Sequence, residues 1–187
     1  MIFRAVEDAD LIRKARRGDV EAYNLLISRW EKRVYNYLLR IVGDREEALD
    51  LSQDVFLKSY QNLRKLDDPA RFASWLFRIA HNEAFSSFRK RRLEKPAPEH
   101  PESTGEEAPM AGPAAFPIEL SIAVTTALGK LSEDQREAVI LKIYQGFKFE
   151  EMAEILSCPV STVKSRLYAA LDALKTQLAP LKTRGVT

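Results

Sequence analysis

Six of the nine prolines of this chain lie between residues 93 and 117, together with two glycines and five glutamates. Proline removes the backbone N–H that a helix needs. The stretch also has almost no large apolar side chains with which to offset the entropy of ordering. We therefore expect a flexible linker at residues 93–117. It divides the chain into residues 1–92 and 118–187, and each part must build a core of its own.

Each part reads as a set of amphipathic helices, because apolar residues recur along it at steps of three and four. We find no alternating strand pattern and no internal repeat. The predicted fold class is therefore all-α, with two small helical domains. Helices are expected at about residues 8–17, 20–42, 44–63, 70–92, 118–131, 132–144, 147–156 and 159–174.

Side chains that can accept hydrogen bonds from free N–H groups mark several of the helix starts. We expect Asp8 or Asp10 to cap the first helix, and Asp19 to cap the second. Asp44 is expected to cap the third. Glu47, three residues later, is placed to complete a reciprocal capping box.

Charge and cysteine content narrow the possible function classes. The net charge of +2 divides into +5 for residues 1–92, −4 for residues 93–117 and +1 for residues 118–187. This mild excess suits focused contact with a polyanion. The single cysteine, Cys158, excludes an internal disulfide and a multi-cysteine zinc site, and beside a proline it is expected to be inert packing. With no signal-peptide core and no run of eighteen apolar residues, we expect a cytoplasmic protein without membrane insertion.

The segment from Phe147 to Leu174 predicts two helices joined by a tight turn at residues 157–159. Pro159 suits the first position of the second helix. Short hydroxyls, cations and a phenol are left on the outer surface of that helix: Ser161, Thr162, Lys164, Ser165, Arg166 and Tyr168. Hydroxyls suit phosphates, while Lys and Arg can donate to guanine edges in the major groove. By spacing alone, an ordinary surface helix explains the pattern equally well.

Two motif blocks lie on either side of the predicted linker. The first block is EEALDLSQDVFLKSYQNL followed by RFASWLFRIAHNEAFSSFRKRR, and the second is LSEDQREAVILKIYQGFKFEEMAEILSCPVSTVKSRL. Together they resemble bacterial sigma factors of the extracytoplasmic-function group. The resemblance implies a transcription initiation factor without catalytic activity. Its N-terminal domain, like sigma region 2, would bind core RNA polymerase and open the −10 element. Its C-terminal domain, like sigma region 4, would read the −35 element.

The partners that the resemblance implies are core RNA polymerase, promoter DNA and an anti-sigma factor; no cofactor and no metal ion is expected. Asp50, Gln53 and Asp54 share one helix face at i, i+3 and i+4. Such a cluster is usually a solvated surface, but the resemblance implies contact with the coiled coil of the largest polymerase subunit. Acid–base catalysis is disfavoured, because His81 and His100 lie elsewhere and no phosphate-binding glycine loop occurs.

The predicted fourth helix mixes aromatic residues with cations, a combination that suits a strand with unstacked bases. Its apolar residues at helical spacing are better explained as core: Phe72, Trp75, Leu76 and Ile79. The better DNA candidates are Arg78, Asn82 and Arg89. The resemblance adds a pocket before this helix for a flipped base of the non-template −10 strand, formed by Lys65, Asp67, Asp68 and Arg71.

Two other function classes remain open at this stage. A stand-alone helix–turn–helix regulator would bind duplex DNA without joining polymerase. It leaves the Asp50-Gln53-Asp54 helix and the arginine-aromatic helix without a role. A helical adaptor, or a decoy that binds an anti-sigma factor and has no DNA role, is the third class.

Overall fold

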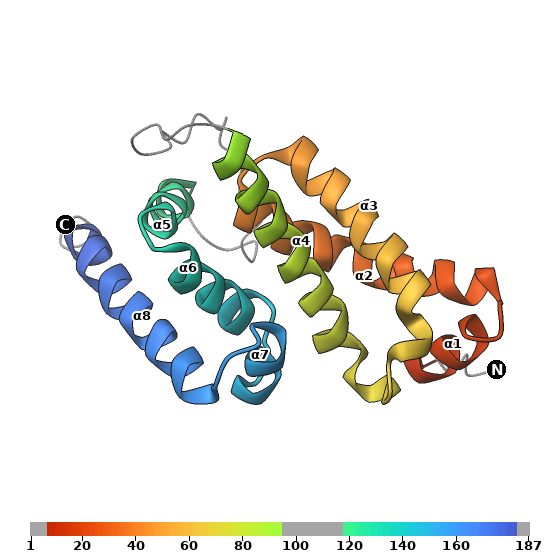
Figure 1. Cartoon of the computed structure of the whole chain (residues 1–187). Coiled ribbons are helices and arrows are strands. Elements are labelled where there is room, and N and C mark those ends of the chain that lie inside the picture. Colours follow the sequence, from red (N-terminus) through yellow and green to blue (C-terminus); the bar gives the residue numbers. More distant parts are fainter. Residues whose placement is uncertain (1–6, 95–117, 183–187) are drawn as a thin grey trace. The chain divides into compact units, whose positions relative to one another are not determined.

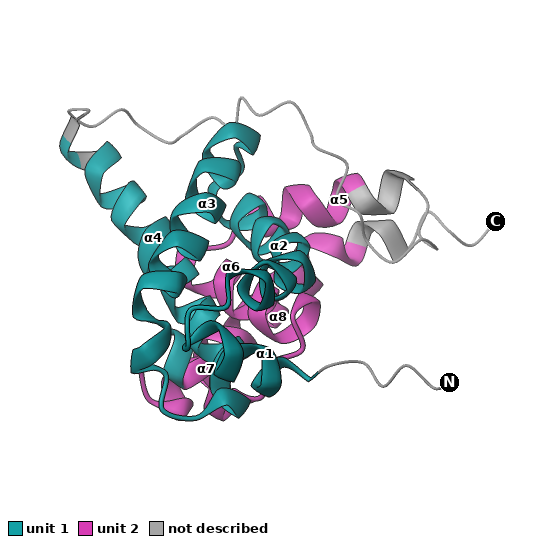
Figure 2. Ribbon diagram, turned by 90° about the vertical axis from the view of Figure 1, so that its right-hand side faces the viewer, with its two compact units in different colours: residues 1–99, 154–157 teal, residues 100–153, 158–187 magenta. Residues whose placement is uncertain are grey.

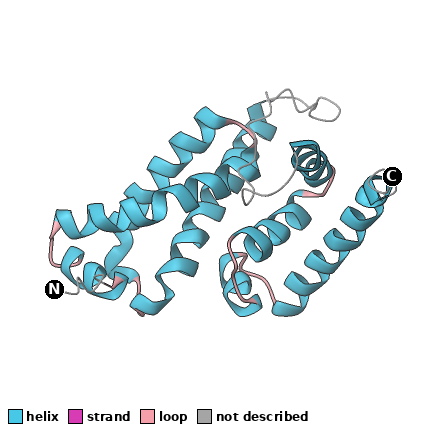
Figure 3. Cartoon of the chain, turned by 180° about the vertical axis from the view of Figure 1, so that it is seen from behind, coloured by secondary structure: helices cyan, strands magenta, loops and turns pink. Residues whose placement is uncertain are grey.

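The structure, a computed structural model, describes residues 7–94 and 118–182 (Figure 1). All regular structure within these two ranges is helical, which confirms the all-α prediction (Figure 3). None of the helices in these ranges is long and apolar enough to cross a membrane. The elements are α1 (Asp8–Ala15), α2 (Val20–Val42), α3 (Arg45–Asn62), the 3₁₀ turns η1 (Leu63–Lys65) and η2 (Pro69–Arg71), α4 (Phe72–Glu94), α5 (Ile118–Gly129), α6 (Glu133–Val139), the π turn η3 (Ile140–Tyr144), α7 (Phe149–Ile155) and α8 (Val160–Lys182).

The chain divides into two compact units (Figure 2). The first comprises residues 1–99 with 154–157, and the second comprises residues 100–153 with 158–187. The predicted linker begins at residue 93, but residues 93 and 94 form the last positions of α4. Residues 95–117 lie outside the described residues, so the flexibility of the linker and the limits of the two predicted domains stay predictions.

The first unit is built by α2 packing on α1 and α3, and by α4 packing on α3 and α2. Its core is mostly apolar along the middle of these helices, where the Tyr37 and Phe77 rings meet at 5.1 Å between centroids. Hydroxyl groups are also built into this core. The buried Tyr23 hydroxyl donates to the carbonyl of Phe56 at 2.5 Å, and burial raises the pKa of Tyr23.

Two of the three predicted caps in this unit are confirmed. Asp19 accepts a hydrogen bond from the Ala22 N–H at 3.0 Å, and Asp44 accepts one from the Glu47 N–H at 2.8 Å. Gly43, which ends α2, has a φ of +79°, the left-handed conformation that glycine adopts without a steric cost.

The predicted cap of α1 is wrong. Glu7 occupies the N-cap position and makes no side-chain capping bond. Asp8 instead accepts from Arg29 Nη1 at 2.7 Å and from Trp30 Nε1 at 2.9 Å, both on α2. Two donors from a packed helix hold this carboxylate more strongly than one backbone N–H at a mostly exposed helix start.

The reciprocal capping box at the start of α3 is also not completed. The Glu47 carboxylate points to α4, where it accepts from Ser87 Oγ at 2.5 Å and pairs with Arg91 Nη2 at 3.0 Å. A second ion pair joins the same two helices, between Lys58 Nζ and Glu83 Oε2 at 2.5 Å. These polar contacts support α4 along the length of α3.

The second unit is organised around α8, on which α5 and α6 pack. The helix predicted at residues 132–144 begins with a capping box between Ser132 and Gln135 and is continuous, but its second half is a π turn. There the Gln145 N–H donates to the Ile140 carbonyl, five residues back, at 3.0 Å. Gly146 then ends the helix with a φ of +76°, as predicted.

Candidate nucleic-acid interface

The outer face of α3 carries the predicted acidic-amide cluster. Asp50, Gln53 and Asp54 are all exposed, while the opposite face of the helix is buried in the core. Two leucines on the outer face are also open to solvent, Leu49 at 53% and Leu57 at 56% of their surface. The outer face of α3 thus combines carboxylates and an amide with exposed apolar surface. Neither leucine was predicted as part of the surface, although Leu57 follows Asp54 by three residues and could have been placed on this face.

The residues predicted to form the base pocket lie in and directly after the loop between α3 and α4. Leu63 and Leu66 are buried and fix the loop to the core, while Lys65, Asp67 and Asp68 are exposed. Asp68 has a local task as well, because its Oδ1 accepts from the Ala70 N–H at 2.9 Å and caps η2. The exposed charged residues of the loop therefore lie on a backbone that is held by the buried leucines before them and by the Asp68 cap after them.

One exposed stripe runs from η2 along α4. Arg71, Arg78, Asn82 and Arg89 are all exposed and follow one another at steps of seven, four and seven residues. Such steps return to nearly the same side of a helix. From Arg78 to Arg89 the stripe extends over roughly 16 Å at 1.5 Å per residue. It can therefore follow several phosphates of one strand.

The apolar residues of α4 divide between the core and the surface. Phe72 and Leu76 are buried as expected, and Trp75 and Ile79 are half-buried. Further along α4, the half-buried rings of His81, Phe85 and Phe88 contact one another, at 4.5 and 5.6 Å between successive centroids. The Arg91 guanidinium lies 5.1 Å from the centroid of the Phe88 ring. This aromatic row remains partly accessible for stacking.

The predicted helix–turn–helix is formed by α7 and α8. The turn ends α7 with Ser157 at a φ of +50°, and the Cys158 N–H donates to the Ala153 carbonyl at 3.1 Å. This is the hydrogen bond of a Schellman motif, in which glycine usually takes the left-handed position. α8 begins one residue later than predicted, since Pro159 precedes it and offers its carbonyl to the Val163 N–H at 3.1 Å.

The inner stripe of α8 is buried at Val163, Leu167 and Ala170, which leaves the predicted DNA face outside. Among its residues Ser161, Lys164, Ser165 and Tyr168 are exposed, and Thr162 is half-buried. The Lys164 ammonium lies 5.3 Å from the centroid of the Phe149 ring in α7. Lys142, whose Nζ donates to the Phe147 carbonyl at 3.0 Å, lies 4.7 Å from the centroid of the same ring. The ammonium of Lys164 thus lies beside an aromatic ring near the start of α8.

Arg166 is placed differently from Lys164. Its Nη2 pairs with Asp134 of α6 at 2.7 Å, and its Nη1 lies 3.9 Å from the Cys158 sulfur. Its side chain is 29% exposed. The guanidinium therefore joins α8 to α6 and to the turn, which gives it a bracing position in the motif.

Cys158 lies half-buried in this turn. Burial raises the pKa of its thiol, Asp134 and Glu137 raise it further, and Arg166 opposes them. A raised pKa leaves little reactive thiolate at neutral pH. Among the described residues, no three histidine, cysteine or carboxylate side chains lie together as a metal site.

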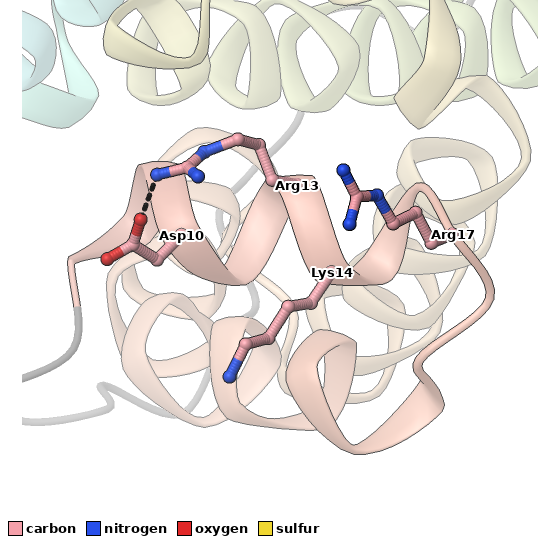
Figure 4. A pocket seen from close by; sticks show the side chains of 4 residues that line it. All are labelled: Asp10, Arg13, Lys14 and Arg17. Carbon is pink, nitrogen blue, oxygen red and sulfur yellow. Dashed lines mark hydrogen bonds and ion pairs between the residues drawn. The ribbon is translucent and has the colours of Figure 1, made fainter.

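A basic hollow on α1 was not predicted. It has a volume of about 320 Å³ and is lined by Asp10, Arg13, Lys14 and Arg17 (Figure 4). Arg13 pairs with Asp10, three residues before it. The charge of this surface was visible in the sequence as the run RKARR, but nothing in its spacing pointed to a role.

Comparison with known proteins places both units. The family model described as Sigma-70 region 2 matches residues 26–94, and that described as Sigma-70, region 4 matches residues 121–174. The chain is 30% identical to the RNA polymerase sigma-H factor of Pseudomonas aeruginosa, over 94% of this chain and 95% of that protein. It is 31% identical to the ECF RNA polymerase sigma-E factor of Escherichia coli, over 95% of this chain and 97% of that protein.

Among solved structures, the chain resembles the sigma factor RpoE from Bartonella quintana, crystallised with the anti-sigma factor NepR. The TM-score is 0.66 and the identity 26%, with 84% of this chain and 96% of that chain covered.

Proposed function

We propose how this chain, which belongs to the extracytoplasmic-function group of RNA polymerase sigma factors and is a transcription initiation factor, divides its work between two helical domains. Each domain would bind a different promoter element. The first predicted domain, residues 1–92, would bind core polymerase and hold the melted −10 strand. The second predicted domain, residues 118–187, would read the −35 duplex. Residues 93–117 would be the flexible tether between them.

The polymerase surface is assigned to the outer face of α3. Asp50, Gln53 and Asp54 supply carboxylates and an amide, while Leu49 and Leu57 supply apolar area beside them. Apolar side chains with charged neighbours suit a stable protein interface, where the charges set orientation and the leucines are desolvated. This face and the cationic stripe of α4 occur in one unit, and that observation carries the proposal.

The −10 surface is assigned to the loop before α4 and to the stripe on α4. Lys65, Asp67, Asp68 and Arg71 would form the pocket for the flipped base. Arg78, Asn82 and Arg89 would follow the strand that leaves it. Extruding a base costs a few kcal/mol, so recognition needs a pocket that is already shaped.

The −35 surface is assigned to the first turns of α8. Ser161, Thr162, Lys164, Ser165 and Tyr168 would contact the duplex, with Lys164 donating to a base edge. Arg166 would contribute by bracing α8 against α6.

Core RNA polymerase and promoter DNA are therefore the proposed partners, in the cytoplasm. Sigma factors are non-catalytic, and we assign this chain no catalytic activity of its own. An anti-sigma factor is a further proposed partner, because the structurally similar RpoE was solved with one.

In vitro transcription tests this function. The purified chain, added to core polymerase, should direct initiation from a subset of genomic promoters that share −35 and −10 elements. Transcription that stays at the level of core enzyme alone would contradict it. The stand-alone regulator is disfavoured by the family assignment. It predicts tight binding to duplex DNA with no change in where polymerase starts.

A further inference from the structure

We infer that Arg16 is a positioning residue for −10 recognition, holding the base-pocket loop in its binding shape from outside the loop. The inference rests on the proposed function, because it needs that loop to receive a promoter base. Its evidence is a set of contacts between α1 and the loop that the sequence analysis did not foresee.

Arg16 reaches the loop with two donors. Its Nε donates to the carbonyl of Leu63 at 3.1 Å, and its Nη2 donates to the carbonyl of Leu66. These two carbonyls lie at either end of η1, which contains the exposed Lys65. One planar guanidinium therefore joins both ends of the turn that presents Lys65, and Asp67 follows directly.

The Leu66 carbonyl depends on Arg16 for a hydrogen bond. Leu66 directly follows the 3₁₀ turn and has an extended backbone, at φ −75° and ψ 109°. The whole residue is only 4% exposed, so its backbone as well as its side chain is largely shielded from water. A carbonyl in such a place loses water and must find another donor. A charged donor makes a stronger bond than a neutral one.

α1 itself is fixed well enough to act as a support. Leu11 and Ile12 are buried, and α1 packs on both α2 and η2. Asp8 at its start accepts from two side chains of α2. Arg16 follows the last helical residue, so its guanidinium is anchored by a helix that cannot shift independently of the core.

The loop is thus supported at three points. The side chains of Leu63 and Leu66 anchor it in the core, and Asp68 caps η2 at its far end. Arg16 joins the backbone carbonyls of the two leucines. Lys65 and Asp67 stand exposed within this frame. Without Arg16 they remain present, but the turn that aims them opens more often.

The test compares Arg16→Gln with Arg17→Gln in the full chain. Arg17 is the next residue, loses the same charge, is exposed, and points into the basic hollow (Figure 4). Arg16→Lys is the conservative variant, since an ammonium can donate but cannot reproduce the planar fork.

Two readouts are needed. The first is amide hydrogen exchange of residues 63–71 in the free protein, with α2 and α3 as internal reference. We expect Arg16→Gln to speed exchange in the loop about tenfold while the reference stays unchanged. The second is transcription with core polymerase from promoters with one −35 element and systematically altered −10 bases. In Arg16→Gln, discrimination between −10 bases should be about tenfold lower than in the wild type. Arg16→Lys should lose less discrimination, and Arg17→Gln should discriminate as the wild type does.

Unchanged loop exchange in Arg16→Gln would overturn the inference. So would faster exchange with wild-type discrimination between −10 bases. A wild-type chain that directs no promoter-specific initiation would instead overturn the proposed function, and the exchange data would still decide whether Arg16 holds the loop.

Discussion

Replacing Lys164 with alanine should weaken −35 binding strongly while leaving the fold almost intact. The ammonium lies 5.3 Å from the centroid of the Phe149 ring, and an exposed cation–π contact contributes about 0.5–1 kcal/mol. Lys142 occupies the same ring at 4.7 Å, so the ring keeps one cation. We expect the free energy of unfolding to fall by about 0.5 kcal/mol. A lost contact to a base edge costs about 1–3 kcal/mol, so Kd for the −35 duplex should rise roughly 5- to 150-fold.

Fluorescence anisotropy at several salt concentrations measures this effect, with a duplex taken from a mapped promoter and a scrambled duplex beside it. Lys164→Met is the matched control, because it keeps most of the aliphatic stem and removes only the charge. It should lose affinity as alanine does. A loss of equal size on both duplexes, with a salt slope lower by about one, would show a phosphate contact and refute base reading. Unchanged affinity would remove Lys164 from the interface.

Four further outcomes are expected. Arg166→Ala should lower the free energy of unfolding, measured by urea titration, by about 1 kcal/mol, because the 2.7 Å ion pair with the 49% exposed Asp134 is screened by solvent. Adding Asp134→Ala to Arg166→Ala should destabilise the protein little further. Ser157→Gly should raise it by about 0.5–1 kcal/mol, because glycine carries no penalty at a φ of +50°; a lower Tm would contradict this. Asp54→Lys should weaken binding to core polymerase about tenfold without changing affinity for the −35 duplex. Burial raises the pKa of Tyr23 above 10.0, so near this pH the folded state keeps a proton that the unfolded state loses. The free energy of unfolding should therefore fall as the pH rises past about 10, and Tyr23→Phe should reduce this decline.

Local rules in the sequence predicted the helices and most of their ends. Asp19 and Asp44 each lie directly before a helix, where a backbone N–H three residues ahead has no other partner. Gly146 ends a helix because glycine alone takes a left-handed φ without a penalty. These choices depend on neighbours within one turn, so they are visible in a linear pattern.

The two capping predictions that failed concern side chains for which a donor on a packed helix competes with a backbone N–H nearby. Asp8 and Glu47 both stand at helix starts, and both side chains turn instead to donors on packed helices, Asp8 to Arg29 and Trp30, and Glu47 to Ser87. Those donors lie 21, 22 and 40 residues away in sequence. Spacing cannot reveal such partners, and for the same reason it could not predict the contacts between α1 and the loop before α4.

In α8, helical geometry already separates the two cations of the predicted DNA face. Lys164 and Arg166 are two residues apart, which on an α-helix separates their directions by about 200°. Their side chains therefore leave α8 in nearly opposite directions. Arg166 lies three residues after the buried Val163, beside the core stripe, and so reaches Asp134 of α6. Ser161, Ser165 and Tyr168 share the side of Lys164 and are exposed with it. The side of α8 that carries these four residues therefore forms most of the proposed −35 surface, while Arg166 joins α8 to α6.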